Sequence, residues 1–298
     1  MMQSRQIKYF LAVADHLHLT AAAESLHISQ PALSRSIHQL ESRLGVPLFE
    51  RLPTGVALTR FGEILARRAR VMELDAEHTL AEIRALETGS SGMLRIGAGP
   101  VWLTTFLPPA IAALQRQHPG IDAEITGGVI DTMIPALLHG KLDMVCSSLD
   151  FPNHPELVKV HLTSISHVVL ARREHPLTRK KNVVAKDLLS YPWIALRDDH
   201  VWRNRMGSFF VARSLTPPKP RIVIAAGVRM LQWLNHGDYL ASAPAAMLPE
   251  AERLGIVALT LDGTFWDSPA GVVYREMTLQ PKGIGYLTTI LKDQLFRA

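Results

Sequence analysis

The sequence predicts an α/β protein in three parts, and three observations carry this prediction. Apolar residues recur at helical spacing through most of residues 1–59, with two short strand-like stretches near the end of that segment. A seven-residue apolar repeat follows within residues 60–90. From Met93 onward, short apolar strands alternate with helical segments, which is typical of an α/β domain.

Composition limits the class of protein. The chain has 298 residues, of which 47% are hydrophobic and 20% charged, enough for two or three folded domains. It shows no apolar run of the length that a membrane span needs, no signal-peptide pattern, and one cysteine, Cys146. We therefore expect a cytoplasmic protein without disulfides and without membrane contact. The net charge of +5 permits nucleic-acid binding but does not establish it.

The first sixty residues predict three helices. Alanine in the second favours close helix packing, and proline in the first turn of the third is typical of a helix start. Their features are, in order, the apolar repeat Ile7, Phe10, Leu11 and Ala14; the stretch Ala21–His27 capped by Thr20; and the stretch Pro31–Leu44 ended by Gly45.

The third helix has one face of hydrogen-bonding side chains: Gln30, Ser34, Arg35, His38 and Gln39. Gln and Arg can pair with base edges in a major groove, and Ser can reach a base or a phosphate. A helix exposed only to solvent would show the same composition, so this face alone leaves both interpretations open.

A β-hairpin predicted directly after the helices favours the DNA interpretation. Strands Pro47–Arg51 and Val56–Thr59 flank the turn Leu52–Gly55, and the hairpin places Arg51, Thr54 and Arg60 where they can meet phosphates. A helix-turn-helix followed by such a wing is a specific combination.

This segment resembles the DNA-binding domain of the LysR-type transcriptional regulators. The resemblance implies that Gln30, Pro31, Ser34 and Arg35 approach the major groove and that the wing grips the adjacent minor groove. The matching residues are Thr20, Ala22, Ala23, Leu26, Ser29, Gln30, Pro31, Ser34, Ile37, Leu40, Glu41, Leu44, Gly45, Leu48, Phe49, Arg51, Leu58, Thr59 and Gly62.

A long helix is predicted from Arg60 to about Glu87. Its apolar positions have an averaged period of 3.5, as in a coiled-coil seam, which favours a dimer over a helix packed only on its own domain. The resemblance adds pairs of dimers and contact with RNA polymerase. Thr88–Gly92 is predicted to be a hinge. The seam residues are Leu65, Ala69, Met72, Ala76, Thr79, Ile83 and Leu86.

The remaining two thirds resemble the LysR effector-binding domain, whose two lobes have the architecture of periplasmic solute-binding proteins. The resemblance implies lobe one over residues 91–165 and 269–298, lobe two over 166–268, and a small-molecule effector between them. The predicted strands are Leu94–Gly97, Ile121–Thr126, Leu142–Ser147, Val168–Leu170, Trp193–Leu196, Arg221–Ala225, Tyr239–Ala243 and Gly271–Arg275. Helices are predicted near Leu103–Gln117, Asp131–His139, Trp202–Arg213, Val228–His236 and Gly283–Phe296.

The effector pocket departs from the family pattern. Apolar Val101 and Ile130 stand where many relatives have a hydroxyl residue, and Tyr239 replaces a glycine. We therefore expect an apolar, aromatic pocket, although Trp102 and Trp202 can equally be core residues. The predicted effector-binding residues are Val101, Trp102, Thr104, Ile130, Ser148, Arg197, His200, Trp202 and Ala226.

Other chemistry is not predicted. Gly97-Ala98-Gly99 lacks the third glycine of a dinucleotide loop, because Trp102 occupies its place. The thirteen histidines are scattered, so we expect no metal site, and no nucleophile–base motif indicates an enzyme. The leading hypothesis is a DNA-binding regulator that responds to an effector and needs no other cofactor. An enzyme with a vestigial helix-turn-helix and a ligand-free architectural DNA protein are the alternatives.

Overall fold

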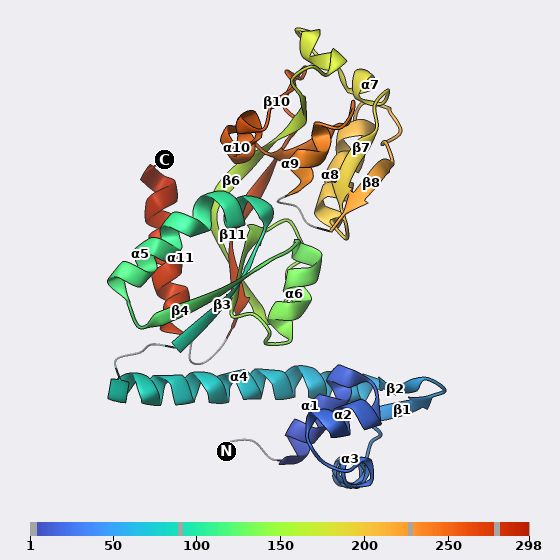
Figure 1. Ribbon diagram of the computed structural model, residues 1–298, viewed down its shortest axis with the longest axis vertical. Coiled ribbons are helices and arrows are strands. Elements are labelled where there is room, and N and C mark those ends of the chain that lie inside the picture. Colours follow the sequence, from blue (N-terminus) through green and yellow to red (C-terminus); the bar gives the residue numbers. More distant parts are fainter. Residues whose placement is uncertain (1–4, 89–91, 226–228, 277–280, 298) are drawn as a thin grey trace. The chain divides into compact units, whose positions relative to one another are not determined.

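The structure is a computed structural model that describes residues 5–88, 92–225, 229–276 and 281–297 (Figure 1). The chain forms two compact units: residues 1–92 with 138–141, and residues 93–137 with 142–298. Among the described residues, no helix combines the length and the apolar character that crossing a membrane requires.

The N-terminal unit is a helix-turn-helix with a two-stranded wing and a long helix. Its core includes Phe10, Leu33, Ile37, Leu40 and Leu48, which are all buried. The elements are α1 (Arg5–His16), α2 (Leu19–Ser25), α3 (Gln30–Leu44), β1 (Phe49–Leu52), β2 (Gly55–Leu58) and α4 (Arg60–Thr88).

The helix boundaries follow the sequence signals with one exception. Helix α3 carries Pro31 in its first turn and ends at Gly45, which has a left-handed backbone with φ of 72°, as predicted. The predicted cap of α2 is wrong: the helix begins at Leu19, so Thr20 lies inside it and His18 occupies the cap position. Leu17, which follows the end of α1, has a left-handed φ of 51°, so the turn between the two helices is only two residues long.

Two side chains join the recognition helix, the wing and α4. One carboxylate oxygen of Glu41 in α3 accepts the backbone N–H groups of Leu48 and Phe49, at 2.8 and 3.2 Å. Thr59 caps α4, because its Oγ1 accepts the N–H of Gly62 at 3.1 Å, and it donates to the carbonyl of Pro47 at 2.7 Å. The start of β1 and the start of α4 are thereby held against the end of α3.

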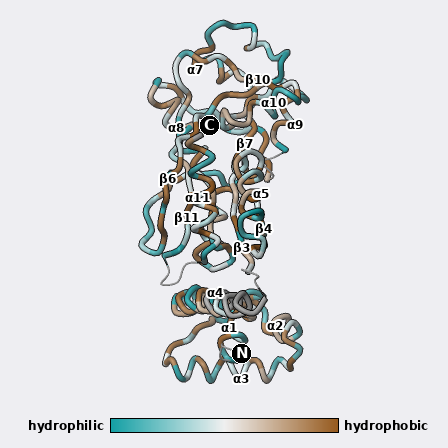
Figure 2. The backbone as a smooth tube through the Cα atoms, turned by 90° about the vertical axis from the view of Figure 1, so that its left-hand side faces the viewer, coloured by the Kyte–Doolittle hydropathy of each residue, from teal (hydrophilic) through white to brown (hydrophobic). Residues whose placement is uncertain are grey.

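Helix α4 differs from the predicted seam over its first turns. Ala66 and Ala69 are buried in the core of the N-terminal unit, so Ala69 is not available to a partner helix. The exposed large apolar side chains among the described residues of α4 are Phe61, Ile64, Met72 and Leu80, of which only Met72 belongs to the predicted seam; Figure 2 shows hydrophobic and hydrophilic positions along the same helix. The 3.5 period is therefore partly the pattern of a helix that covers its own domain. The predicted seam residues Ile83 and Leu86 have side chains that the structure does not describe.

The C-terminal unit is built on one seven-stranded mixed sheet. The strand order is β10-β6-β11-β5-β3-β4, and β9 pairs with β6. A separate pair, β7 and β8, is parallel. The strands are β3 (Gly92–Ala98), β4 (Ile121–Gly127), β5 (Met144–Ser148), β6 (Leu157–Arg172), β7 (Trp193–Leu196), β8 (Pro220–Ile224), β9 (Ala241–Pro244), β10 (Ile256–Ala258) and β11 (Trp266–Arg275).

Helices cover this sheet and connect its strands. Helix α11 packs against α5, and both flank the same end of the sheet (Figure 1). The predicted first helix of this unit begins with a π-helical turn, η1 (Trp102–Phe106), before the α-helix proper. The helices are α5 (Leu107–Gln117), α6 (Ile130–Leu138), α7 (Ala185–Leu188), α8 (His200–Val211), α9 (Met230–Leu234), α10 (Leu248–Arg253) and α11 (Lys282–Arg297).

Strands β6 and β11 are the main departure from the predicted elements. They pair antiparallel over their whole common length and run through both halves of the unit (Figure 1). The sequence analysis predicted only three residues of β6 and the last five of β11. Strands β9 and β10 pair with the last residues of β6, and β5 pairs with the last residues of β11. Strands β6 and β11 therefore link the two halves and line the space between them.

Candidate functional site

The first candidate site is the outer face of α3. Gln30, Pro31, Arg35 and His38 are exposed and Ser34 is half-buried, on the side of the helix opposite its buried leucines. Glu41 is the one acidic residue of α3, and its Oε1 atom accepts hydrogen bonds from the N–H groups of Leu48 and Phe49. The second carboxylate oxygen, Oε2, lies 3.4 Å from His38 Nδ1, and the Glu41 side chain is 18% exposed. The face therefore offers cations and neutral hydrogen-bonding groups, and its single negative charge is mostly buried and paired.

Further residues lie beside this face, and of these only Gln39 was expected there from the sequence. A shallow hollow along α3 combines Arg35 and His38 with four further side chains, three from the same helix and one from α1. Those four are Gln6, Gln39, Ser42 and Arg43. Gln6 could not have been found from sequence spacing, because the packing of α1 against α3 brings it there.

The wing presents a second set of exposed polar groups. Arg51 and Thr54 lie on the hairpin of β1 and β2, and Arg60 is the first residue of α4; all three are exposed. Their exposure leaves the two guanidinium groups and the hydroxyl available to phosphate oxygens.

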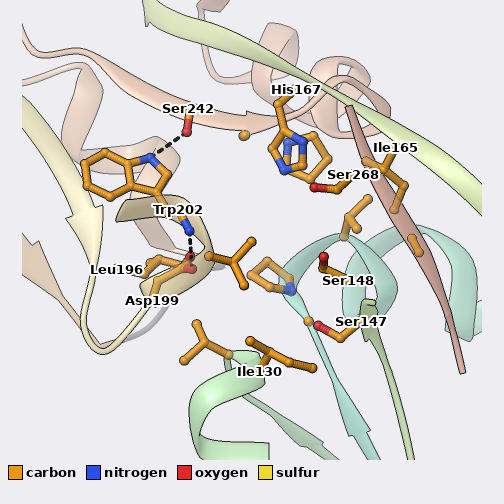
Figure 3. A pocket seen from close by; sticks show the side chains of 18 of the residues that line it. Ile130, Ser147, Ser148, Ile165, His167, Leu196, Asp199, Trp202, Ser242 and Ser268 are labelled. Atoms are coloured by element: carbon orange, nitrogen blue, oxygen red, sulfur yellow. Dashed lines mark hydrogen bonds between the residues drawn. The ribbon is translucent and has the colours of Figure 1, made fainter. Parts of the chain in front are cut away.

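The second candidate site is a pocket inside the C-terminal unit, with a volume of about 120 Å³ (Figure 3). The carboxyl ends of β3, β4 and β5 form one wall, β6 and β11 form the back, and α8, α9 and β9 close the other side. The lining residues are Gly99, Pro100, Val101, Trp102, Gly128, Val129, Ile130, Ser147, Ser148, Ile165, His167, Leu196, Asp199, Val201, Trp202, Met230, Ser242, Ala243, Pro244, Met247, Trp266, Ser268 and Ala270.

Strand register explains why four of these residues share one wall. His167 of β6 lies opposite Trp266 of β11, and Ile165 lies opposite Ser268. Residues two apart on a strand, and residues directly opposite on a neighbouring strand, point to the same face of a sheet. In Figure 3 the side chains of His167, Ser268 and Ile165 accordingly lie together at the back of the pocket.

The polar groups of the pocket fall into two sets. Trp202 is fully bonded: its indole N–H donates to Ser242 Oγ at 2.7 Å, and its backbone N–H donates to Asp199 Oδ1 at 2.9 Å. In contrast, Trp102 Nε1, His167 Nδ1 and Ser268 Oγ are buried and have no hydrogen-bond partner among the described residues.

Burial also sets the protonation of the pocket. Burial lowers the pKa of His167 to about 4, although hydrogen bonding to the Ile165 backbone and the negative charge of Asp267 both act to raise this pKa. The imidazole is therefore neutral near pH 7. Burial raises the pKa of Asp199, and the nearby carboxylate of Asp131 raises it further, while the Trp202 N–H lowers it. Among the described lining residues there is no lysine or arginine.

The structure brings together five of the nine predicted effector residues: Val101, Trp102, Ile130, Ser148 and Trp202 line the pocket. Trp102 is also a core residue, because it is 1% exposed and packs edge-on against Phe106 at 5.2 Å. Ala226 lies outside the described residues.

Three predicted polar anchors do not line the pocket. Thr104 is exposed and donates to the carbonyl of Pro100 at 3.0 Å, one turn back in its own helix. Arg197 is exposed beyond the end of β7, where its backbone N–H pairs with Ile224. His200 is exposed and pairs with Asp131. The polar side chains that do line the pocket include the predicted Ser148 together with Ser147, His167, Asp199, Ser242 and Ser268. Of these, His167 and Ser268 come from the unpredicted parts of β6 and β11.

Other chemistry finds no support in the described part of the chain. No group of three or more His, Cys, Asp or Glu side chains there is placed to hold a metal ion. Cys146 is buried within the sheet, and burial raises the pKa of its thiol far above the ordinary range.

A winged helix-turn-helix with an exposed polar face, joined to an α/β unit with an internal pocket, defines a DNA-binding regulator with a ligand-binding domain. The chain belongs to the LysR family: residues 4–63 match the family described as bacterial regulatory helix-turn-helix protein, lysR family, and residues 87–295 match the LysR substrate binding domain. It is therefore a DNA-binding transcriptional regulator with an effector-binding domain and not an enzyme, and its family domain implies a small-molecule effector.

Known proteins of this family are similar over most of the chain. The HTH-type transcriptional regulator YybE of Bacillus subtilis is 30% identical over 72% of this chain and 74% of its own length. The transcriptional dual regulator OxyR of Escherichia coli is 28% identical over 92% of this chain and 90% of its own length. The crystal structure of CbnR, a LysR family transcriptional regulator, shares the fold with a TM-score of 0.68 at 24% identity, covering 99% of both chains.

Proposed function

We propose that the protein binds promoter DNA as a dimer or tetramer and changes that binding when a small molecule occupies the pocket. In this proposal residues 1–59 bind DNA, residues 60–90 join two copies, and residues 91–298 sense the effector. The observation that carries it is the exposed face of α3, which holds Gln30, Arg35 and His38 while its one carboxylate, Glu41, is mostly buried and bonded to the start of β1.

The DNA contacts follow from side-chain chemistry. Gln30 and Arg35 can each make two hydrogen bonds to a base edge in the major groove, and Ser34 and Pro31 lie beside them on the same turn of α3. Arg51, Thr54 and Arg60 then contact phosphates next to this groove. His38, one turn further along α3, completes the same face.

The oligomer rests on α4. Phe61, Ile64 and Met72 are 50%, 47% and 60% exposed, on a helix whose other side is buried against its own unit. A second copy of the helix can cover these side chains, and two recognition helices are then available for two half-sites of DNA. Contact with RNA polymerase belongs to the same proposal through the family resemblance.

Fluorescence anisotropy with labelled DNA tests the DNA part of this proposal. Overlapping fragments of the DNA beside the protein's own gene should include one that binds at least tenfold more tightly than the others, with an affinity that falls steeply with salt. Arg35→Ala should abolish this preference. Arg253→Ala, which removes an exposed arginine of the C-terminal unit, should leave it unchanged. Equal binding of all fragments by the unchanged protein would contradict the proposal.

A further inference from the structure

The pocket contains three polar groups that the protein itself does not satisfy. Trp102 Nε1 comes from η1, His167 Nδ1 from β6 and Ser268 Oγ from β11, and each is buried without a hydrogen-bond partner among the described residues. Buried polar groups are almost always paired, because leaving one unpaired costs about 1–3 kcal/mol. Three such groups on the wall of a single pocket are available to hydrogen-bond a molecule that enters it.

The donors and acceptors restrict that molecule. The indole N–H of Trp102 can only donate, whereas the neutral imidazole of His167 and the hydroxyl of Ser268 can each donate or accept. A ligand oxygen is therefore needed opposite Trp102. The oxygen of a ligand hydroxyl can accept the hydrogen bond of the Trp102 indole N–H, and the same hydroxyl can donate a hydrogen bond to His167 or Ser268.

The charge of the wall disfavours an anion. The described lining residues include no lysine or arginine. The one carboxylate on the wall is Asp199, and Asp131 lies close enough to raise its pKa. Asp131 also occupies the first turn of α6, whose N-terminus would otherwise attract an anion. A buried carboxylate on the ligand would thus face negative charge without a counter-ion.

A cationic ligand is not favoured either. The Oδ1 atom of Asp199 already accepts the backbone N–H of Trp202 at the start of α8, so this carboxylate serves as a helix cap. The rest of the wall is largely apolar, with Ile130, Ile165, Leu196 and Met230 among its side chains. A ligand ammonium would lose its hydration on entering the pocket, and the only carboxylate among the described lining residues already accepts a hydrogen bond from the protein.

The volume sets the size. The pocket has about 120 Å³. An apolar protein cavity of about 150 Å³ binds one benzene molecule. The pocket is slightly smaller than that cavity, so a compound with one six-membered ring and one small polar group needs it to widen a little, whereas a two-ring compound needs a large widening.

We propose that the pocket binds an uncharged single-ring compound whose hydroxyl or carbonyl oxygen accepts a hydrogen bond from Trp102 Nε1 and whose polar group also meets His167 and Ser268. This inference rests on the proposed function, because it assigns the chemical class of the effector. The ring lies against the apolar side chains, and Trp202, whose two N–H groups are already bonded, contributes only its surface.

Isothermal titration calorimetry on the full chain with four one-ring compounds tests this. Benzyl alcohol, toluene, benzoate and benzylammonium share a ring and a one-carbon substituent and differ in their polar group. We expect benzyl alcohol to bind about tenfold more tightly than toluene, and both ions to bind at least tenfold more weakly than benzyl alcohol. Tighter binding of either ion, or binding of none of the four, would overturn the inference.

Two variants separate the proposed hydrogen bonds from general apolar binding. Ser268→Ala removes only a polar atom that the protein leaves unpaired, so this variant should fold as the unchanged protein does. Trp102→Phe also removes buried ring atoms from the core, so its melting temperature should fall and is measured beside its affinity. Each should weaken benzyl alcohol binding about tenfold and leave toluene binding nearly unchanged. Trp233→Phe, at a half-exposed tryptophan outside the pocket, is the matched control and should have no effect. Unchanged affinity for benzyl alcohol in both pocket variants would also overturn the inference.

The DNA measurement distinguishes failure of this inference from failure of the proposed function. If a specific fragment binds and none of the four compounds does, the ligand class is wrong and DNA binding stands. If benzyl alcohol binds as expected and DNA affinity does not change at saturation, the ligand class is supported and the effector role in the proposed function fails.

Discussion

His200 at the start of α8 is joined to Asp131 at the start of α6. The backbone N–H of His200 donates to Asp131 Oδ2 at 2.8 Å, and its ring Nδ1 lies 3.1 Å from Oδ1. Arg205, further along α8, donates to Asp150 Oδ2 at 2.6 Å. Both contacts connect α8 with the β3–β5 side of the pocket, so α8 is held across the pocket at two points.

The first prediction concerns this link. Asp131→Ala removes the acceptor of the His200 N–H, so the start of α8 should open more often. Because the side chains are partly exposed, the free energy of opening the start of α8 should fall by about 1 kcal/mol. Amide hydrogen exchange at residues 200–203 should then be roughly fivefold faster. Glu250→Ala removes the exposed partner of Arg253 and is the control, with no change expected at α8. Equal exchange rates in both variants would show that the link does not hold α8.

The second prediction is a loss of stability below neutral pH. The pKa of His167 is about 4 in the folded protein, below the ordinary value of 6.5. The unfolded chain therefore takes up a proton on this residue as pH falls below about 6.5, and the folded protein does not do so until about pH 4. Between pH 7 and pH 5 the unfolding free energy should fall by about 2 kcal/mol through His167 alone.

Urea unfolding followed by tryptophan fluorescence measures this loss in the relevant unit, since all five tryptophans lie between residues 102 and 266. His167→Phe should remove about 2 kcal/mol of the pH dependence between pH 7 and pH 5. His161→Phe, at an exposed position of the same strand, should retain it. The same pH dependence in the unchanged protein and in His167→Phe would contradict the assignment.

The N-terminal unit could be predicted closely from the sequence because its signals are local. Pro31 and Gly45 mark the two ends of the recognition helix, and Thr59 marks the start of α4. The face of α4 was harder to predict. A period of 3.5 cannot distinguish residues that face a partner from residues such as Ala69 that face their own core, since both need apolar side chains.

The pocket could be predicted only in part. Val101, Ile130 and Ser148 follow strands whose carboxyl ends are recognisable from apolar runs. His167 and Ser268 could not be found, because β6 and β11 contain polar residues on partly exposed faces and do not show a continuous strand pattern. Their place on one wall depends on long-range pairing between residues about 100 positions apart.

The third prediction concerns Gly62, in the first turn of α4. A Cβ atom added there would lie 2.1 Å from the backbone oxygen of Leu48 and 2.9 Å from Leu58 Cδ2. Gly62→Ala should therefore push α4 away from the wing and destabilise the N-terminal unit by about 2–3 kcal/mol. Thermal unfolding followed by circular dichroism, together with loss of DNA binding, would detect this change.

Gly207→Ala is the matched control for Gly62. It is also a helical glycine, in α8, but a Cβ atom added there meets nothing within 4 Å. Because alanine is the better helix former, this variant should be as stable as the unchanged protein or more stable, by up to about 1 kcal/mol. A Gly62→Ala protein that unfolded at the temperature of the control would show that the wing adapts without cost.

The last prediction concerns the exposed apolar side of α4. If a second copy covers Met72, then Met72→Glu places two carboxylates in the interface and should raise the dissociation constant of the dimer at least tenfold. Sedimentation velocity over a range of protein concentrations measures this change. Val211→Glu alters a side chain that is 65% exposed on α8 and is the matched control, for which no change in assembly is expected. Because Met72 itself is 60% exposed in the single chain, the substitution should leave the fold intact, so a weaker dimer would report the interface and not unfolding. An unchanged dissociation constant in Met72→Glu would place the contact between copies elsewhere on the protein.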